Sequence, residues 1–222
     1  MSNEVEFEYT GIEERKDVPN NVTIVRFHSS VTEVCREMFQ ECKQLKKVVL
    51  NEGLKKIGFR SFRECRKLEH INLPSTIIEI RDEAFHLCSD LVKVVLNEGL
   101  QRVGKLIFRG CESLKSIQLP SAITELSDLA FAGCISLKKV VLNEGLYKIG
   151  CEAFARCASL EYIALPSTVT EIGRHAFYDC LRLRQVELHE RIQKIGRDSF
   201  YGCSFMKRFT FSKLSIRLDN IL

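Results

Sequence analysis

The chain has 222 residues, of which 45% are hydrophobic, so it is long and apolar enough to build a continuous core. Its net charge of +4 at pH 7 is too small to favour nucleic acid as a partner. Its apolar runs are far shorter than the roughly 20 residues of a membrane-spanning helix, so we expect no membrane span.

Residues 1–21 form the expected N-terminal cap. Apolar and acidic side chains alternate over residues 4–9, with Val5, Phe7 and Tyr9 as the apolar members, and this predicts a strand that covers the first coil. The first ten residues lack the basic start and apolar stretch of a secretory signal. We therefore expect an intracellular location, or an extracellular one if the chain is a fragment that has lost its signal.

Residues 22–205 contain eight repeats of 23 residues, without insertion or deletion. A cysteine recurs at every 23rd position from Cys42 to Cys203, and a phenylalanine precedes each by three residues, from Phe39 to Phe200. With its leucine and valine or isoleucine columns, the unit reads C-x-x-L-x-x-[VI]-x-L. Because one coil cannot bury its apolar face alone, the coils must stack, and identical residues form ladders through the core.

Each unit begins with a short segment of alternating character. Around Val48 the pattern predicts a half-buried strand whose neighbour lies one repeat away. A later apolar pair, such as Leu54 and Ile57, turns the chain back toward the core. Glycines follow this pair in five coils, where we expect a tight bend: Gly58, Gly104, Gly150, Gly173 and Gly196.

The segment from Leu160 to Cys180 reads L-x-x-I-x-L-P-x-x-V-x-x-I-G-x-x-A-F-x-x-C. This pattern resembles the 23-residue unit of the BspA-type leucine-rich-repeat family, and the resemblance covers roughly residues 22–211. It implies recognition of a ligand or protein, without enzymatic activity or a cofactor. The asparagine that usually follows the strand in leucine-rich repeats is replaced, for example by Gly53 and Thr76. We therefore expect the usual asparagine ladder to be absent.

The predicted fold is a repeat solenoid comprising residues 1–222 as a single leucine-rich-repeat domain. It is a right-handed superhelix with a parallel sheet of about nine short strands on the concave face. We expect few or no regular helices on the convex face.

A second regularity doubles the period to 46 residues. Val-Leu-Asn-Glu-Gly-Leu recurs at 49–54, 95–100 and 141–146, and Leu-Pro-Ser occurs once between successive copies and again after the last. Duplication of a two-coil unit explains this alternation without any function. The alternative is a ligand with a matching spacing.

Residues 206–222 are predicted to form the last strand and a C-terminal cap. Met206, Phe209 and Phe211 occupy strand columns, and an apolar stripe at helical spacing follows Ser212, through Leu214, Leu218, Ile221 and Leu222. The stripe stops in mid-pattern. This indicates either a short closing helix or a piece of a longer protein, and we favour the second.

Residue types that carry chemistry show no catalytic or metal-binding pattern. The column cysteines point in parallel, so we expect ten free thiols, and Cys35 and Cys151 lack the paired spacing of a zinc site. The five histidines do not share one repeat column as a set. Recurrent acids such as Glu52 and Glu98 place like groups in a row, whereas catalysis needs unlike groups in one pocket. We expect no enzyme, metal or cofactor.

The expected function is non-catalytic protein recognition through the concave sheet face, as an interaction or scaffold module. The alternative is a cell-surface adhesin or a ligand-binding domain of a larger protein. Side chains that alternate with the core positions form two exposed columns. The predicted binding residues are Lys47, Val49, His70, Asn72, Lys93, Val95, Ser116, Gln118, Lys139, Val141, Tyr162 and Gln185.

Other partners are less favoured by these columns. The lysine stripe is interrupted at His70 and Ser116, which argues against nucleic acid as a partner. The open ends of the stack offer a route to self-association.

Overall fold

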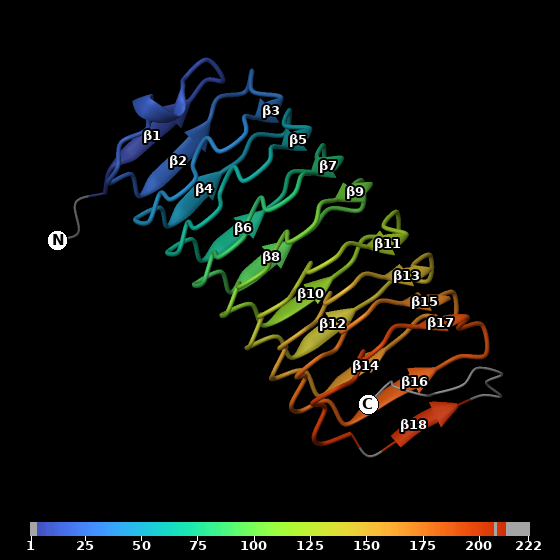
Figure 1. Cartoon of the computed structure of the whole chain (residues 1–222). Helices are drawn as coiled ribbons and strands as arrows, with labels where there is room; N and C mark the ends of the chain where they lie inside the picture. The colour runs from blue at the N-terminus through green and yellow to red at the C-terminus, as the bar shows by residue number, and fades with distance from the viewer. Residues whose placement is uncertain (1–3, 207, 212–222) are drawn as a thin grey trace.

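Each 23-residue repeat forms one coil, and the coils stack along a single axis from β1 at one end to β18 at the other (Figure 1). The computed structural model describes residues 4–206 and 208–211. One core of buried side chains runs through the stack, from Tyr9 near the N-terminus to Cys203 in the last coil. The predicted solenoid of parallel strands is therefore confirmed.

One side of the stack carries the longer strands, and we call it the strand face. Its ten strands within the described residues are β1 Glu6–Tyr9, β2 Ile24–Phe27, β4 Lys47–Val49, β6 His70–Asn72, β8 Lys93–Val95, β10 Ser116–Gln118, β12 Lys139–Val141, β14 Tyr162–Ala164, β16 Gln185–Leu188 and β18 Arg208–Phe211. All paired neighbours are parallel.

The strand face differs from the predicted sheet in two respects. There is one strand more than the nine expected, because β1 of the N-terminal cap joins the sheet beside β2. The strands also form two sheets, because no ladder joins β12 to β14 in the described part of the chain. The concave curvature of this face stays a prediction.

The ends of the stack follow the prediction where they are described. The N-terminal strand is confirmed, and the single helix among the described residues is the three-residue 3-10 turn η1 Arg15–Asp17 in the cap. The helical stripe expected from Leu214 to Leu222 lies outside the described residues.

The next side of each coil carries a second parallel ladder that the sequence pattern did not predict. It consists of two-residue strands: β3 Glu33–Val34, β5 Lys56–Ile57, β7 Glu79–Ile80, β9 Arg102–Val103, β11 Glu125–Leu126, β13 Lys148–Ile149, β15 Glu171–Ile172 and β17 Lys194–Ile195. The ladder is interrupted between β9 and β11. At that coil Ser127 stands in the glycine column, and its hydroxyl donates to the Val103 carbonyl over 2.8 Å.

The glycines after this ladder stand directly before the turn-rich segment, and they are needed because the backbone of the preceding coil approaches closely. Neither Gly58 nor Gly104 has the left-handed conformation. A Cβ added at Gly58 would collide with the carbonyl oxygen of Val34 in the preceding coil. A Cβ at Gly104 would collide with the backbone of Arg81 and Asp82.

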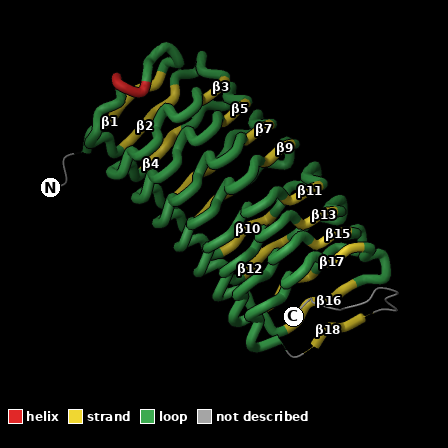
Figure 2. The backbone as a smooth tube through the Cα atoms, viewed as in Figure 1, coloured by secondary structure: helices red, strands yellow, loops and turns green. Residues whose placement is uncertain are grey.

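The third side of each coil is the turn-rich segment around the buried phenylalanine, and we call it the turn face (Figure 2). Residues on both sides of Phe62 are left-handed, with φ of 53° at Arg60 and 59° at Glu64. The N–H groups of these three residues donate to carbonyl oxygens of the following coil over 2.8–3.1 Å. Alternating backbone conformations thus satisfy the polar groups of the turn without a helix or strand.

Two columns of identical residues fill the core. The phenylalanines from Phe39 to Phe200 stack face to face, with ring centroids 5.1–5.6 Å apart and interplanar angles of 2–13°. The thiol of each column cysteine from Cys65 to Cys203 donates to a phenylalanine carbonyl of the preceding coil, over 3.0–3.3 Å. Cysteine therefore fills space and also satisfies a buried carbonyl, which a valine could not do.

The predicted absence of an asparagine ladder is wrong for alternate coils. Asn97 donates from Nδ2 to the carbonyl oxygens of Pro74 and Ile77 in the preceding coil, over 2.8 and 3.1 Å. Asn51 and Asn143 make the corresponding hydrogen bonds. These asparagines stand two residues before the position considered in the sequence, which is why they were missed.

The turns of alternating coils interlock. Glu98 accepts hydrogen bonds from the backbone N–H and the hydroxyl of Ser121 in the following coil, over 3.0 and 3.1 Å. Glu52 and Ser75 form the same contact two coils earlier. The middle turn, Asn97-Glu98-Gly99, thus bonds a Pro-Ser turn on each side. The 46-residue alternation therefore has a structural reason there as well as an evolutionary one.

Charge also alternates from coil to coil along the second ladder. The residues concerned are Glu33, Lys56, Glu79, Arg102, Glu125, Lys148, Glu171 and Lys194. Pairing places Lys148 opposite both Glu125 and Glu171, and its ammonium lies 3.5 Å from the Glu125 carboxylate. Because like charges directly opposite each other destabilise a sheet, a charged residue copied every 23 positions would be unfavourable here. Copying every 46 positions avoids that repulsion.

The variant Lys148→Glu tests this alternation, because it places three glutamates in a row on β11, β13 and β15. We expect it to lower the free energy of unfolding by about 1–2 kcal/mol, since two attractive pairs of roughly 0.2–1 kcal/mol each become repulsive. Urea denaturation measures the loss, which should shrink in about 1 M salt.

The control is Lys138→Glu, at an exposed strand-face lysine that forms no ion pair with any described residue. It should cost less than about 0.5 kcal/mol. Equal losses in the two variants would contradict a stabilising role for the alternation.

Candidate binding face

The twelve residues predicted to form a binding surface lie on the strand face, in two neighbouring columns. The first column is Lys47, His70, Lys93, Ser116, Lys139, Tyr162 and Gln185, and the second contains Val49, Asn72, Val95, Gln118 and Val141. All are exposed except Val49, which is half-buried. Strand alternation causes this placement, because the residue between the columns, such as Val94, is buried in the core.

Between β4 and β16, pairing along the strand face loosens at every second junction, whereas β16 and β18 are paired over four residues. β6 and β8, β10 and β12, and β14 and β16 are paired over three residues each. β4 and β6 share a single pair, as do β8 and β10, and β12 and β14 share none among the described residues. Each loosened junction follows a Lys-Val-Val strand, so the 46-residue period extends to the backbone of the sheet.

Three hollows include the loosened junctions, and we call them the strand-face grooves. The first is lined from β2, β4 and β6 and has a volume of about 460 Å³. The second is lined from β8, β10 and β12, with about 310 Å³, and the third from β12 and β14, with about 570 Å³. Ten of the twelve predicted residues line a groove, and the exceptions are Val49 and Gln185. The structure therefore gathers most of the predicted surface into three similar sites.

The lysines at the grooves carry charge that no described residue neutralises. Lys47, Lys93 and Lys139 are exposed, and none forms an ion pair or side-chain hydrogen bond within the described part of the chain. The second ladder behaves differently, as the contact of Lys148 with Glu125 shows. The groove lysines are therefore available to an anionic partner.

Apolar surface accompanies each of the two later lysines. Val95 is 43% exposed, Val141 39% and Tyr162 50%. The valines stand one position beyond the buried strand residue, so each projects beside the lysine of its own strand. The two later grooves can thus hold an apolar group next to an anionic one.

The grooves include acidic rim residues that the sequence did not single out as part of a binding surface. Glu4 and Glu69 line the first groove, Glu98 the second, and Glu144 and Glu161 the third. The signal for Glu98 and Glu144 was present in the Val-Leu-Asn-Glu-Gly-Leu repeat, which continues each Lys-Val-Val strand. The glutamates at the rims would repel a partner segment of high negative charge density.

The turn face has a hollow of its own, of about 560 Å³, which the sequence did not predict. Its floor includes Gly110 and Gly133, which replace Leu87 in the same column, and its walls include Ile135 and Tyr178. Small residues replacing a larger one in a repeat column are the signal that could have found it.

No group of three potential metal ligands occurs among the described residues. The buried His86 has a structural environment: its Nδ1 lies 3.3 Å from Glu83, and Arg109 contacts its Nε2 at 2.9 Å. Burial lowers the pKa of His86, which favours the neutral ring. The contacts of this histidine fix its place between coils.

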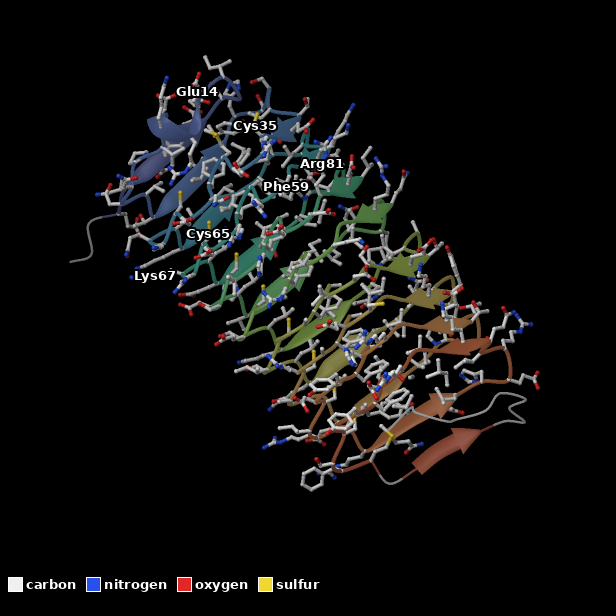
Figure 3. All side chains as sticks on the ribbon, viewed as in Figure 1. Glu14, Cys35, Phe59, Cys65, Lys67 and Arg81 are labelled. Carbon is white, nitrogen blue, oxygen red and sulfur yellow. The ribbon has the colours of Figure 1, made fainter. Side chains whose placement is uncertain are left out.

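The cysteines divide into eight buried residues and two exposed ones. Burial raises the pKa of the column thiols, to about 12 at Cys203. Cys35 and Cys151 are exposed. In Figure 3, Cys65 lies within the stack of coils, whereas Cys35 lies at the edge that carries β3. All ten are free thiols in the structure.

Comparison with known proteins identifies the family. The model of the BspA-type leucine-rich-repeat region matches residues 18–138 and 124–220, in six copies. The chain therefore belongs to the BspA-type leucine-rich-repeat proteins, as the resemblance indicated. No curated protein gives a significant match. Among the described residues, no helix has the length and hydropathy needed to cross a bilayer.

Solved structures share the fold. A leucine-rich-repeat protein from Bacteroides ovatus is 29% identical, with a TM-score of 0.82 over 93% of this chain and 55% of its own. The T. pallidum leucine-rich-repeat protein is also 29% identical, with a TM-score of 0.64 over 83% and 78%. The pneumococcal vaccine antigen PcpA is 27% identical, with a TM-score of 0.62 over 86% and 51%. This chain thus spans about half the length of two of these proteins.

The burial of the column cysteines predicts that the ten thiols divide into two classes of reactivity. In native protein at about pH 8, a thiol reagent should modify Cys35 and Cys151 rapidly, because these two residues are exposed. The eight column thiols should react only after denaturation, when the count rises to ten. The absorbance of the released thiolate measures both stages.

Unreduced protein is used throughout, so that disulfides would lower the final count. A count near zero after denaturation would contradict free thiols. Rapid reaction of more than two thiols in the native protein would contradict the buried column.

Proposed function

We propose that this chain is a non-catalytic recognition module that binds a protein partner through the strand face. The observation that carries the proposal is the set of three strand-face grooves, each with an unpaired lysine at its edge. Exposed apolar side chains beside Lys93 and Lys139 add area that a partner can bury. Membership of a leucine-rich-repeat family supports the same function.

The arrangement of the grooves favours binding over catalysis. Like groups recur along an open face, whereas a catalytic site gathers unlike groups in one enclosed pocket. The recurrence suits a partner that contacts several coils at once, because each coil offers a similar set of contacts.

The double variant Lys93→Glu with Val95→Glu tests the proposal in the middle of the strand face. Both side chains are exposed, so the fold should survive, while a partner would meet reversed charge and a lost apolar contact. Partners are captured from the cells of origin on immobilised wild-type and variant protein. For the partner identified, titration calorimetry should show binding at least about tenfold weaker.

The control is Lys55→Glu, at an exposed lysine beyond the strand face. Lys56 is a poorer control, because its ammonium lies 3.9 Å from the Glu79 carboxylate. Partners lost by the double variant and kept by Lys55→Glu would support the proposal. A double variant that keeps every partner with unchanged affinity would assign binding to the turn face or the ends.

The location of the domain separates two forms of this function. Free thiols throughout the core favour a reducing compartment, so we propose an intracellular module. The second candidate is a cell-surface recognition domain. It is favoured by a structure titled as a leucine-rich cell surface protein from Faecalibacterium prausnitzii, 22% identical with a TM-score of 0.58 over 87% of this chain and 61% of its own. Surface labelling of intact cells distinguishes the two.

A further inference from the structure

The spacing of the groove lysines restricts the shape of the partner, provided that the strand face is the binding surface proposed above. Lys47, Lys93 and Lys139 lie on β4, β8 and β12, which are two coils apart each time. Neighbouring strands of a sheet are about 4.7–4.9 Å apart, so successive groove lysines project from backbones about 9.4–9.8 Å apart. A partner that lies along the stack must repeat at this distance.

Polyproline II is the regular backbone conformation that fits this repeat. It has three residues per turn and a rise of about 3.1 Å, so a side chain returns to the same side every 9.3 Å or so. A β-strand returns every two residues, after about 6.6–6.8 Å. In an α-helix a side chain returns to the same side after about 5.4 Å. Two turns span about 10.8 Å, which exceeds the spacing between successive groove lysines by about 1 Å each time. Over all three grooves, the side-chain repeat of polyproline II departs from the lysine spacing by no more than about 1 Å.

Charge decides which side chain recurs in the partner. The groove lysines have no carboxylate partner within the described residues, so an anionic group every third residue would satisfy each of them. The rims carry Glu98 and Glu144, which would repel a segment with a charge at every position. The exposed valines beside the lysines suit a proline ring at an intervening position.

We propose that the strand face binds an extended acidic segment of a partner protein in the polyproline II conformation, with a carboxylate at every third residue. The segment runs along the stack, across the strands. Each of its turns places one carboxylate beside Lys47, Lys93 or Lys139. At the two later grooves a proline of the same turn packs against Val95 or Val141. About nine residues reach all three grooves.

The probe is a fluorescent peptide with four repeats of Pro-Pro-Glu, and its affinity is measured by fluorescence anisotropy in low salt. An isomer with the four glutamates contiguous keeps the composition, the net charge and the polyproline backbone, and changes only the spacing. We expect the spaced peptide to bind at least about fivefold more tightly than the isomer, because only its carboxylates match all three lysines.

The protein variant for this test is Lys93→Glu with Lys139→Glu, which should weaken binding of the spaced peptide by about tenfold or more. The matched control is Lys43→Glu with Lys55→Glu. It makes the same change in net charge at two exposed lysines that line none of the strand-face grooves. Its affinity should stay within about twofold of wild type.

Three results would overturn the inference. They are equal affinity for the two peptides, equal loss in the two charge variants, and displacement of the peptide by a lower concentration of a 12-nucleotide oligothymidylate. If neither peptide binds while Lys93→Glu with Val95→Glu still loses its captured partners, the polyproline II assignment is contradicted and the proposed binding face is supported. If that variant keeps its partners, the proposed function itself falls.

Discussion

The structure depends on one constraint, which is that coils of equal length stack in register. With no insertion in any repeat, each residue faces the residue 23 positions away in the next coil, and on the strand ladders the two backbones are about 4.8 Å apart. Identical apolar residues gain from this, as the stacked ring planes of Phe39 to Phe200 show. Identical charged residues would destabilise the stack, because each would face a residue of the same charge in the next coil. The doubled period of 46 residues is how this chain meets both demands.

The same alternation affects contacts between coils at three places: the second ladder, the turns that contain Asn-Glu-Gly or Pro-Ser, and the strand face. On the second ladder it sets Lys148 between two glutamates. At the turns it sets Asn97 and Glu98 to bond neighbours on opposite sides. On the strand face it separates one groove lysine from the next by an uncharged or weakly basic position, such as Ser116 or His70. Duplication supplied the pattern, and stacking gives a reason for keeping it.

Much of the fold could be predicted because its signals repeat eight times. The 23-residue spacing of Cys42 and its equivalents was enough to predict the core columns, and period-two alternation around Val48 was enough to predict which strand residues are exposed. The second ladder escaped prediction because its strands, such as Lys56–Ile57, are too short for a periodic pattern. The role of Asn97 was not predicted, because the asparagine was expected two residues later, at the position it has in ordinary leucine-rich repeats.

The candidate site was predicted only in part. Side-chain alternation placed Lys93 and Val95 on one face, but no residue pattern shows where a strand loses its neighbour. The pairing of β8 with β10 at Ser116 alone depends on backbone geometry, and so does the groove that results. The recurrence of Lys-Val-Val strands marks the junctions only once the structure shows that they are loosened.

The central claim is that a partner binds the strand face rather than the turn face. The direct measurement replaces either Val95 or Ile135 by a benzophenone amino acid, and irradiates each protein with the partner bound. Val95 lines a strand-face groove, and Ile135 lines the turn-face hollow, so the two positions report on different sides of the stack, in coils close to each other. The account predicts covalent capture of the partner from position 95 and none from position 135. Capture from position 135 alone would contradict it.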